Sequence, residues 1–472
     1  MGYVDLRTWL DKVNEINELK HLSGMDPNLE IGALAELLGQ KEGSPSVLLD
    51  DIKGYPKGYR LLLNAEGTLN RLALGLGMPG NYTVEEFVKV IKEKMRTLKP
   101  LPCNEVSDGP IYENVLARDR IDMNMFPAPK WNEGDGGRYI GTGCMVITED
   151  PDEGWVNAGT YRVMLHDRDT LGLRISPSKH GKNHIDKAFK RGESPKIAVT
   201  FGQDFSTYFA ACNEVAYGVS EFEYAGGLVG EPINVIKGPY SGLPIPADAE
   251  IAVEGYIPKD EQRMEGPFGE WTGYYGDDAR MAPIIKVKNV LHRNNPIICG
   301  RPELKPTWCS NLARAVVRSA ILWNELESMG IPGITGVWCH PVGFRLLNLV
   351  SVKTMFHGHS KHVGMLATQC RTAHYLGRYT IVVDDDIDIY NDQNYLWALL
   401  TRSDPASSIE ILRDCVSGPL DPRISKQDKK NNLFYNSRAI IDACRPYHWK
   451  DEFPKPIGFS KERLNEVMKK LG

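Results

Sequence analysis

The sequence predicts a protein of mixed α/β and β class, with an N-terminal α/β segment, a central β domain, a long connecting helix and a C-terminal α/β domain. The chain has 472 residues, which is several times the length of a typical domain. Apolar residues make up 42% and charged residues 25%, as in soluble globular proteins. The hydrophobic period also changes along the chain. These observations divide the chain into residues 1–110, 111–305, 306–335 and 336–472.

The first region is expected to begin and end with helices. The opening helix has apolar residues at helical spacing along one face: Leu6, Trp9, Leu10, Val13 and Ile16. Another helix is expected over about 83–97, where Thr83 and Glu86 make a capping box. Prolines at 100 and 102 end it, so residues 98–110 are predicted to be a boundary.

Residues 111–305 are predicted to be mainly β. Short runs rich in β-branched and apolar residues, such as 144–148, 196–200 and 284–287, are separated by Gly, Pro, Asn and Asp. The runs are too many for a helix bundle, and they lack the regular strand–helix alternation of a doubly wound sheet.

The region 306–335 contains the clearest helix, which Ser310 can cap and Gly330 can end. Beyond it, a run over 346–352, a helical segment after Ser360, a strand over 380–383 and a helix around 395–402 alternate as in α/β domains. The tail ends in a short amphipathic helix after a Pro-rich extended piece, and such a tail can dock on a neighbouring subunit or pack on its own.

Charge and cysteine content exclude several classes of function. The net charge of -5 offers no electrostatic footprint for nucleic acid. The chain lacks an apolar run of about 18 residues and the pattern of a signal peptide, so we expect a soluble cytoplasmic protein with no membrane span. Nine scattered cysteines without a C-x-x-C pair indicate reduced thiols rather than a zinc ribbon or a disulfide framework.

The most unusual local pattern is the stretch 265–271, EGPFGEW. It places Glu265 and Glu270 on the two sides of a turn that contains two glycines and a proline. Such a turn fixes the backbone direction tightly, so both carboxylates can point into one small space, as general acid–base catalysis needs. A surface turn flanked by solvated glutamates is the alternative.

A second pattern is the strand-like stretch 155–162, WVNAGTYR. On a regular strand Asn157 and Arg162 would point to opposite faces, because Arg162 comes five positions, an odd number, after Asn157. A site that uses both therefore needs a bulge or bend near Gly159. An ordinary edge strand is the alternative.

Asn157, His180 and Glu221 together offer one amide oxygen, one imidazole and one carboxylate. This mixed ligand set suits Mn²⁺ or Mg²⁺ holding a phosphate better than it suits structural zinc. Each of these residues taken alone is more often structural or solvated.

Two patterns lie in the C-terminal region. Gly358-His359-Ser360-Lys361 reads as a glycine turn into a helix start, where backbone amides and the lysine can seat a phosphate, or simply as a capped helix with an exposed lysine. The acidic run 384–388 could bind a cation, but we interpret it as a loop that caps the next helix.

These four stretches, together with SPSKHG at 176–181 and EFEYAGG at 221–227, resemble the UbiD family of reversible decarboxylases, which use prenylated flavin mononucleotide (prenylated FMN). The resemblance covers nearly the whole chain, from DLRTWL at 5–10 through EGPFGE at 265–270 to VDDDIDIYND at 383–392 and Trp397. It implies that residues 111–305 form a split β-barrel that binds the flavin. It also implies that the C-terminal α/β domain oligomerises, as a homodimer or homohexamer, with hinge motion about the long helix.

The resemblance also assigns residues. The catalytic Arg-Glu-Glu set of the family falls on Arg162, Glu265 and Glu270. The positions that hold Mn²⁺ (or Mg²⁺) against the cofactor phosphate match Asn157, His180 and Glu221. Glu221 is preferred to the neighbouring Glu223 because it follows a serine, as in the family.

Further residues are implied around the cofactor. Trp155 matches a residue whose backbone carbonyl helps to bind K⁺ in relatives, and Lys361 matches a lysine that contacts phosphate. The implied cofactor-binding residues are Asn157, Tyr161, Arg162, Lys179, His180, Glu221 and Lys361. Ser176 and Trp271 are predicted to line the substrate pocket, and Lys179 could receive either a second anionic group or the cofactor phosphate.

The implied activity is reversible, non-oxidative decarboxylation of an aromatic, heteroaromatic or α,β-unsaturated carboxylic acid. In the family it proceeds through a covalent adduct with prenylated FMN, which serves as the electron sink. Glu270 would donate the proton, Arg162 would orient the substrate and the glutamates, and Glu265 would bridge the other two. CO2 is the co-product, and a flavin prenyltransferase would supply the cofactor.

Three other functions stay open at this point. A glycoside hydrolase could use Glu265 and Glu270 as its two carboxylates, but it would leave the possible metal ligands idle. A carrier or assembly protein on the same fold would have no use for a proton donor. A flavin reductase on a split barrel would show NAD(P)H-dependent activity with unmodified flavin.

Overall fold

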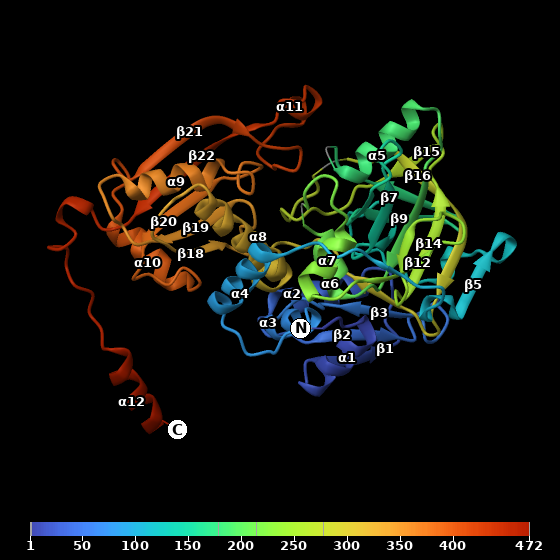
Figure 1. Ribbon diagram of the computed structural model, residues 1–472, viewed down its shortest axis with the longest axis horizontal. Helices are drawn as coiled ribbons and strands as arrows, with labels where there is room; N and C mark the ends of the chain where they lie inside the picture. The colour runs from blue at the N-terminus through green and yellow to red at the C-terminus, as the bar shows by residue number, and fades with distance from the viewer. Residues whose placement is uncertain (1, 178, 214, 277, 472) are drawn as a thin grey trace.

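The computed structural model describes residues 2–177, 179–213, 215–276 and 278–471. Figure 1 shows the N-terminal region in blue lying against a curled sheet in green and yellow, while the C-terminal domain in orange and red lies on the other side of helix α8. Helix α12 at the end of the chain projects away from the body. The mixed α/β and β class predicted from the sequence is confirmed.

The N-terminal region is a small α/β unit. Its helices and strands are α1 (Leu6–Glu15), β1 (Leu19–Ser23), α2 (Glu30–Gln40), β2 (Ser46–Asp50), β3 (Arg60–Leu63), α3 (Leu69–Gly75) and α4 (Val84–Thr97). The predicted capping box is present, since Thr83 accepts from the backbone N–H of Glu86 and the Glu86 side chain accepts from that of Thr83. The sheet order β1-β2-β3-β17 shows that β17 (Ile297–Gly300), from the segment predicted as central, completes this sheet.

The central region contains a ten-stranded sheet curled into a half-barrel. Its path runs β6-β9-β10-β16-β14-β11-β7-β8, and β5 and β15 pair with β16 outside this path. The strands are β5 (Asn114–Ala117), β6 (Arg138–Gly141), β7 (Met145–Glu149), β8 (Val156–Gly159), β9 (Arg162–Asp167), β10 (Thr170–Arg174), β11 (Lys196–Phe201), β14 (Ile251–Tyr256), β15 (Gln262–Glu265) and β16 (Arg280–His292). The predicted strand at 144–148 overlaps β7, which begins one residue later, and those at 196–200 and 284–287 lie within β11 and β16.

The inner face of this sheet is an apolar core. Alternate side chains point inward, and the buried set includes Val146, Val163, Leu171, Leu173, Val199, Val253 and Ile285. A second sheet of β4 (Asn104–Glu105), β12 (Asn234–Lys237) and β13 (Pro244–Pro246) lies beside it, with α5 (His180–Lys190), α6 (Phe205–Ala211) and α7 (Glu221–Val229). The chemistry-bearing residues lie on the strand ends and loops that surround this core.

The long connecting helix is α8 (Trp308–Ser328), shorter at both ends than the predicted segment. The predicted cap is corrected. Thr307 is the N-cap, and Ser310 occupies the third helical position, where its hydroxyl closes the capping box. Gly330 follows the helix end with φ of +77°, as its predicted role requires. The helix packs between α4 and the C-terminal sheet.

The C-terminal domain is a five-stranded sheet with the order β18-β19-β20-β22-β21. Its elements are β18 (Ile334–Cys339), β19 (Leu347–Val352), α9 (His359–Gln369), β20 (Tyr379–Asp384), α10 (Asp392–Arg402), β21 (Ile409–Val416), α11 (Lys426–Lys430) and β22 (Tyr435–Ala443). The predicted βαβα alternation is present in β19-α9-β20-α10. The added strands β18, β21 and β22 complete the sheet.

The tail consists of an extended segment followed by α12 (Lys461–Leu471). Leu464, Val467 and Met468 of this helix are between 47% and 68% exposed, so its predicted apolar face faces solvent in the single chain.

Within the described part of the chain, no helix is both long enough and apolar enough to span a membrane.

Candidate active site

The structure brings Arg162 and the two glutamates of the EGPFGE turn into direct contact. Glu265 accepts two hydrogen bonds from Arg162, from Nε at 2.8 Å and from Nη2 at 2.9 Å. Arg162 Nη1 donates to Glu270 Oε1 at 2.9 Å. The side chain of Glu265 is 1% exposed and that of Glu270 is 19% exposed. The Glu265 carboxylate is therefore fully buried against the arginine, and the Glu270 carboxylate is partly accessible to solvent.

Small residues allow this turn to form. Gly266 has φ of +87°, a backbone conformation that favours glycine. Gly136 lies so close that a Cβ there would be 1.9 Å from the Gly266 carbonyl oxygen, and its N–H donates to the Pro267 carbonyl at 2.8 Å. The loop before β6 thus clamps the turn and fixes the positions of both glutamates.

Tyr139 is a member of this cluster that the sequence analysis missed. Its hydroxyl donates to Glu265 Oε1 at 3.0 Å, and its ring packs on Phe268 with centroids 4.2 Å apart. Burial, followed by the charge of Glu265, raises the pKa of Tyr139, so the phenol stays protonated and keeps donating. The Arg162 guanidinium also lies over the Phe268 ring at 5.4 Å.

The electrostatics favour a permanently charged arginine. Burial alone would lower the pKa of Arg162, but the hydrogen bond and the charge of Glu265 outweigh it, and the pKa is raised. A cation between two carboxylates holds both in defined orientations. The cluster can therefore bind an acid, orient it and exchange a proton through the more exposed Glu270.

A second cluster lies where β8 ends and α7 begins. Glu221, 3% exposed, accepts from Asn157 Nδ2 and from the backbone N–H of Ala158, both at 2.7 Å. Burial raises the pKa of Glu221 to about 7, although those two hydrogen bonds act to lower it. In the described part of the chain, no lysine or arginine pairs with this carboxylate.

Tyr161 joins this cluster to the start of α5. Its hydroxyl donates to Asn157 Oδ1 at 3.1 Å and accepts from the backbone N–H of Gly181 at 3.4 Å. A Cβ at Gly159 would lie 2.4 Å from this hydroxyl, so glycine is required there. The predicted bend is confirmed as a break between β8 and β9 at residues 160–161, which lets Asn157 and Arg162 both serve the site.

His180 is the first residue of α5, and Lys179 is its N-cap. The His180 ring meets the edge of Trp155 at 5.2 Å between centroids, and Tyr217 packs on both rings. The Trp155 carbonyl accepts from the backbone N–H of Asp150 at 2.9 Å. The ring of Trp155 thus packs against the ring of His180, and its backbone carbonyl bonds to Asp150 within the turn between β7 and β8.

The donor set fits a divalent cation. The amide nitrogen of Asn157 donates to the buried Glu221 carboxylate, which has no cationic side-chain partner, and the amide oxygen accepts from Tyr161. Gly181, next to His180 at the helix start, lies against this amide oxygen. A metal ion would supply the positive charge that Glu221 lacks. Among the described residues, no three His, Cys, Asp or Glu side chains are grouped so that they could hold a metal ion, and the set at this site includes an asparagine.

The two predicted pocket residues differ in their placement. Ser176 is exposed just beyond β10, in the loop that leads to Lys179; Ser178 lies outside the described residues. Trp271 is 8% exposed and packs edge-on against Phe344 of the C-terminal domain, with centroids 5.0 Å apart, and against Leu376. Trp271 therefore makes an interdomain contact next to Glu270, and its place in the substrate pocket stays a prediction.

The structure does not bring Lys361 to the site. It lies on α9 in the C-terminal domain, 55% exposed, and forms an ion pair with Glu410 of β21. The sequence placed it by local pattern, whereas the helix that carries it packs on β19, β20 and β22. Lys361 pairs with Glu410 in this chain, and its contact with the cofactor phosphate stays a prediction.

The acidic run after β20 does not cap the next helix, contrary to the interpretation from the sequence, because the N-cap of α10 is Asn391. The carboxylates of the run pair with arginines instead. Asp384 accepts from Arg402 at 2.9 Å and from Arg445 Nε at 3.1 Å, and Asp386 accepts twice from Arg402. Two arginines therefore occupy the carboxylates that a cation would need.

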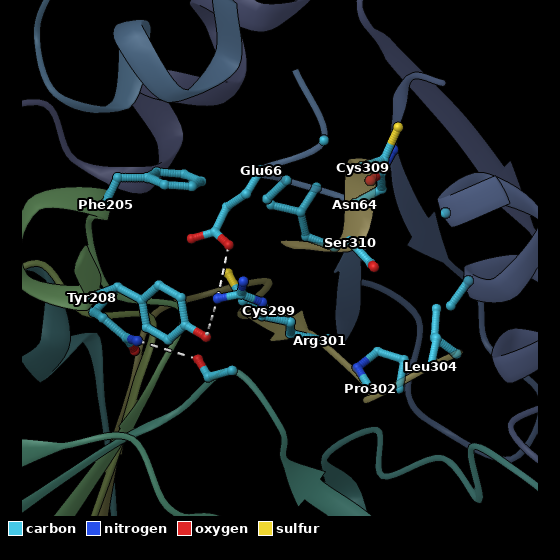
Figure 2. A pocket seen from close by; sticks show the side chains of 18 residues that line it. Asn64, Glu66, Phe205, Tyr208, Cys299, Arg301, Pro302, Leu304, Cys309 and Ser310 are labelled. Carbon is cyan, nitrogen blue, oxygen red and sulfur yellow. Dashed lines mark hydrogen bonds and ion pairs between the residues drawn. The ribbon is translucent and has the colours of Figure 1, made fainter. Parts of the chain in front are cut away.

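A separate cavity of about 80 Å³ lies where the N-terminal region, the barrel and the start of α8 meet. Figure 2 shows Glu66, Arg301 and Tyr208 pointing toward one another at its edge, with Phe205, Pro302 and Leu304 as apolar lining. Arg301 Nη1 is 2.8 Å from Glu66 and donates to the Tyr208 hydroxyl at 3.2 Å. None of the predicted site residues lines this cavity.

Three consecutive parts of the chain match domains of one family. Residues 10–91 match the 3-octaprenyl-4-hydroxybenzoate carboxy-lyase N-terminal domain, residues 104–303 its Rift-related domain and residues 311–443 its C-terminal domain. Together these matches cover most of the chain and include both residue clusters described above.

Similar proteins cover the full length. The chain is 32% identical to a phenolic acid decarboxylase of Bacillus subtilis over 100% of both chains. It aligns with the open form of the vanillic acid decarboxylase of Sedimentibacter hydroxybenzoicus, with TM-score 0.85, 29% identity and coverage of 100% and 99%. It also aligns with an evolved dimeric form of HmfF from Pelotomaculum thermopropionicum in complex with prenylated FMN, with TM-score 0.82, 26% identity and coverage of 97% and 98%.

Proposed function

Because the chain belongs to the UbiD family of carboxy-lyases, we propose that Arg162, Glu265 and Glu270 carry out a reversible, non-oxidative decarboxylation with prenylated FMN. The proposed substrate is an aromatic or heteroaromatic acid, with α,β-unsaturated acids as the broader class. The observation that carries the proposal is the single guanidinium that binds one sealed and one solvent-facing carboxylate. Decarboxylases among its relatives support it.

The chemistry needs an electron sink and a proton donor. When bound, the prenylated flavin supplies the sink for the electron pair that stays on carbon after CO2 leaves. Glu270 donates the proton to that carbon and is refilled from solvent through its exposed side. In the reverse direction Glu270 accepts the same proton.

The other two residues hold Glu270 in place. Arg162 fixes Glu270 Oε1 through Nη1 and so sets the direction of proton transfer. Glu265, fastened by two hydrogen bonds from Arg162 and one from Tyr139, keeps the guanidinium from rotating. The residues thus form one rigid chain from Tyr139 to Glu270.

The second cluster would hold the cofactor. Asn157, His180 and Glu221 would bind Mn²⁺ or Mg²⁺ against the flavin phosphate, and the Trp155 carbonyl would bind K⁺. Tyr161 orients Asn157, and Lys179 lies beside His180 at the helix start. We further propose that a flavin prenyltransferase supplies the cofactor, and that the protein works as a homodimer or homohexamer.

Glu270→Gln tests the proton-donor role. We expect CO2 release from aromatic acids to fall by about 10²–10⁴-fold, because the amide keeps the shape and loses the proton, while flavin content is retained. The measurement is CO2 release together with hydrogen–deuterium exchange at the product carbon in D2O, followed by NMR.

Glu261→Gln is the matched control, because Glu261 is 56% exposed and pairs with Lys286 close to the same turn. Near-normal rates for Glu270→Gln would rule out the assigned donor. Family membership favours this activity over a two-glutamate hydrolase. A cofactor carrier is disfavoured because the proton donor is present and held in place.

A further inference from the structure

The Trp155 side chain lies at the centre of a group of four aromatic rings. Its indole meets the rings of His180, Tyr217 and His184 edge-on, at 5.2, 5.1 and 4.7 Å between centroids. The Tyr217 ring also meets that of His180, at 5.8 Å. Edge-to-face contacts fix the angle between two rings as well as their distance. The angle of the His180 imidazole is therefore coupled to the position of the indole.

Helix α5 presents one face to the loop that carries Trp155. His184, Lys187 and Arg191 lie about one, two and three turns beyond the first residue of the helix, which is His180. All three contact the loop between β7 and β8: the His184 ring packs on Trp155, Lys187 donates to Asp150, and Arg191 donates to the Pro151 carbonyl. The helix and the loop are thus joined along the whole length of α5.

The buried Asp150 side chain fixes the shape of that loop. It is 1% exposed, and its Oδ2 accepts from Lys187 Nζ at 2.6 Å and lies 3.7 Å from His184 Nε2. Its Oδ1 accepts from two backbone N–H groups of the same loop, at 2.8 and 3.2 Å. The backbone N–H of Asp150 donates to the Trp155 carbonyl at 2.9 Å. These bonds hold Trp155 at one place relative to the helix.

His184 holds one side of the indole. It is 1% exposed, and its Nδ1 is 3.0 Å from the Thr148 hydroxyl on β7, so its ring is itself fixed by a hydrogen bond. Among the described residues, the buried Trp155 Nε1 has no hydrogen-bond partner. The orientation of the indole therefore depends on its packing against the neighbouring rings.

We propose that the Trp155 side chain is a positioning residue, which sets the direction of the His180 imidazole for a divalent cation. The inference deepens the proposed function and rests on the metal site assigned there. It is separate from the role of the Trp155 carbonyl, because a change of side chain leaves that carbonyl in place. Gly181 lies against Tyr161 and Asn157 Oδ1, so the helix start is seated beside another proposed ligand. What the indole limits is the rotation of the imidazole.

The test is a titration of the full-length protein with Mn²⁺ in excess FMN, which supplies the phosphate. Electron paramagnetic resonance follows the free ion. We expect Trp155→Leu to weaken Mn²⁺ binding by about 10–100-fold, the range typical for loss of a group that orients a metal ligand. Trp155→Phe keeps an aromatic ring and should lose less. In pulsed spectra at saturating Mn²⁺, the nitrogen coupling of a bound imidazole should be reduced in Trp155→Leu and kept in Trp155→Phe.

Trp308→Leu is the matched control. Trp308 is also half-buried and meets a histidine edge-on, His340 at 5.9 Å, but it packs beside the C-terminal sheet. This variant should bind Mn²⁺ with the affinity and the nitrogen coupling of the wild type. Thermal unfolding of each variant checks that it is folded.

Trp155→Leu protein with the Mn²⁺ affinity and nitrogen coupling of the wild type would overturn the inference. Equal losses in Trp155→Leu and Trp155→Phe, or in Trp155→Leu and Trp308→Leu, would overturn it as well. Failure of the proposed metal site appears differently, as wild-type protein that binds no Mn²⁺, and it removes both claims.

A second variant keeps the test decisive if Trp155→Leu does not fold. Tyr217 is 55% exposed and packs on both Trp155 and His180, so Tyr217→Ala removes a support of the two rings at little cost to folding. We expect a loss of Mn²⁺ affinity at the lower end of the same range. Unchanged affinity in Tyr217→Ala would then overturn the inference.

Discussion

At the residue scale, the buried Glu221 carboxylate indicates that the second cluster could bind a cation. A carboxylate that is 3% exposed and has only N–H donors as partners is costly to keep ionised, and its raised pKa reports this cost. The lowest-cost way to hold it as an anion is a cation shared with neighbouring ligands. Asn157 and His180 are the neighbours that the fold supplies.

His180→Ala is predicted to lose metal and flavin together, because the imidazole would be one of three protein ligands of the ion that seats the phosphate. The measurement is metal analysis and flavin absorbance of the purified variant. His362→Ala, an exposed histidine on α9, is the control that should keep both. A folded His180→Ala protein with a normal flavin and metal content would remove His180 from the ligand set.

Asp248 gives a pH prediction away from the site. Its carboxylate accepts from the Tyr3 hydroxyl at 2.5 Å, and burial followed by the charge of Asp204 raises its pKa to about 7. An unfolded aspartate titrates near pH 4, so the native state holds a proton that the unfolded chain has lost between about pH 4 and 7. The wild-type protein should therefore lose stability as the pH rises through this window.

Asp248→Asn removes this titration. We expect the melting temperature of the variant relative to wild type to rise from pH 5 to pH 8 by roughly 1–4 °C, discounted for the partial exposure of Asp248. Thermal unfolding at three pH values measures it. A difference that stays constant with pH would show that Asp248 has an ordinary pKa in the folded protein.

At the scale of elements, the loop after Glu270 ties the catalytic turn to the C-terminal domain. Trp271 meets Phe344, which has φ of +47° and carries three arginines around its ring, Arg314, Arg318 and Arg345, at 5.4 to 5.7 Å. Lys429 of α11 also donates to the Gly276 carbonyl at 2.9 Å. A left-handed backbone at a bulky residue is costly, so the surrounding contacts must hold it.

Phe344→Ala should therefore loosen Glu270 without removing it. We expect kcat to fall about tenfold or more, with flavin content kept and with recovery in Phe344→Tyr, since a misplaced proton donor slows the chemistry. Steady-state kinetics and flavin absorbance measure this. Phe356→Ala is the control, because Phe356 stacks on His359 at the surface of the same domain. Unchanged kcat in Phe344→Ala would show that the contact serves only packing.

Local signals predicted local structure well. The Thr83 capping box and the break near Gly159 follow from short-range patterns, and the structure has them. The acidic run after β20 was predicted to cap α10, but it pairs with Arg402 and Arg445, which come later in the chain. Ser310 was misplaced as a cap because Thr307, three residues earlier, has the same capping chemistry. The N-cap propensities of Thr and Ser do not decide between Thr307 and Ser310.

Contacts between elements were less accessible from the sequence. Tyr139 joins the catalytic cluster through packing between distant segments, which leaves no local pattern. The pairing of Lys361 with Glu410 also joins segments that are distant in the sequence, so the local pattern at the start of α9 could not predict it. The EGPFGE turn was found because both glutamates lie in one short segment.

At the scale of the whole molecule, three regions meet around the site. The barrel supplies both residue clusters, and α8 connects it to the C-terminal sheet (Figure 1). The exposed apolar face of α12 and the exposed Ile457 and Phe459 lie on the arm that leaves the body. Trp271, in the loop after Glu270, packs against Phe344 and Leu376 of the C-terminal domain. The segment that carries Glu270 is therefore in direct contact with the C-terminal domain through Trp271.

The central claim is that the fold binds prenylated FMN through a metal ion and uses it for decarboxylation. The most direct test is the mass of the cofactor released from protein made without oxygen, in cells that also express a flavin prenyltransferase, with metal analysis of the same sample. We expect the released cofactor to have the mass of prenylated FMN, and the sample to contain about one Mn²⁺ per chain. Folded protein that carries neither flavin nor metal would contradict it.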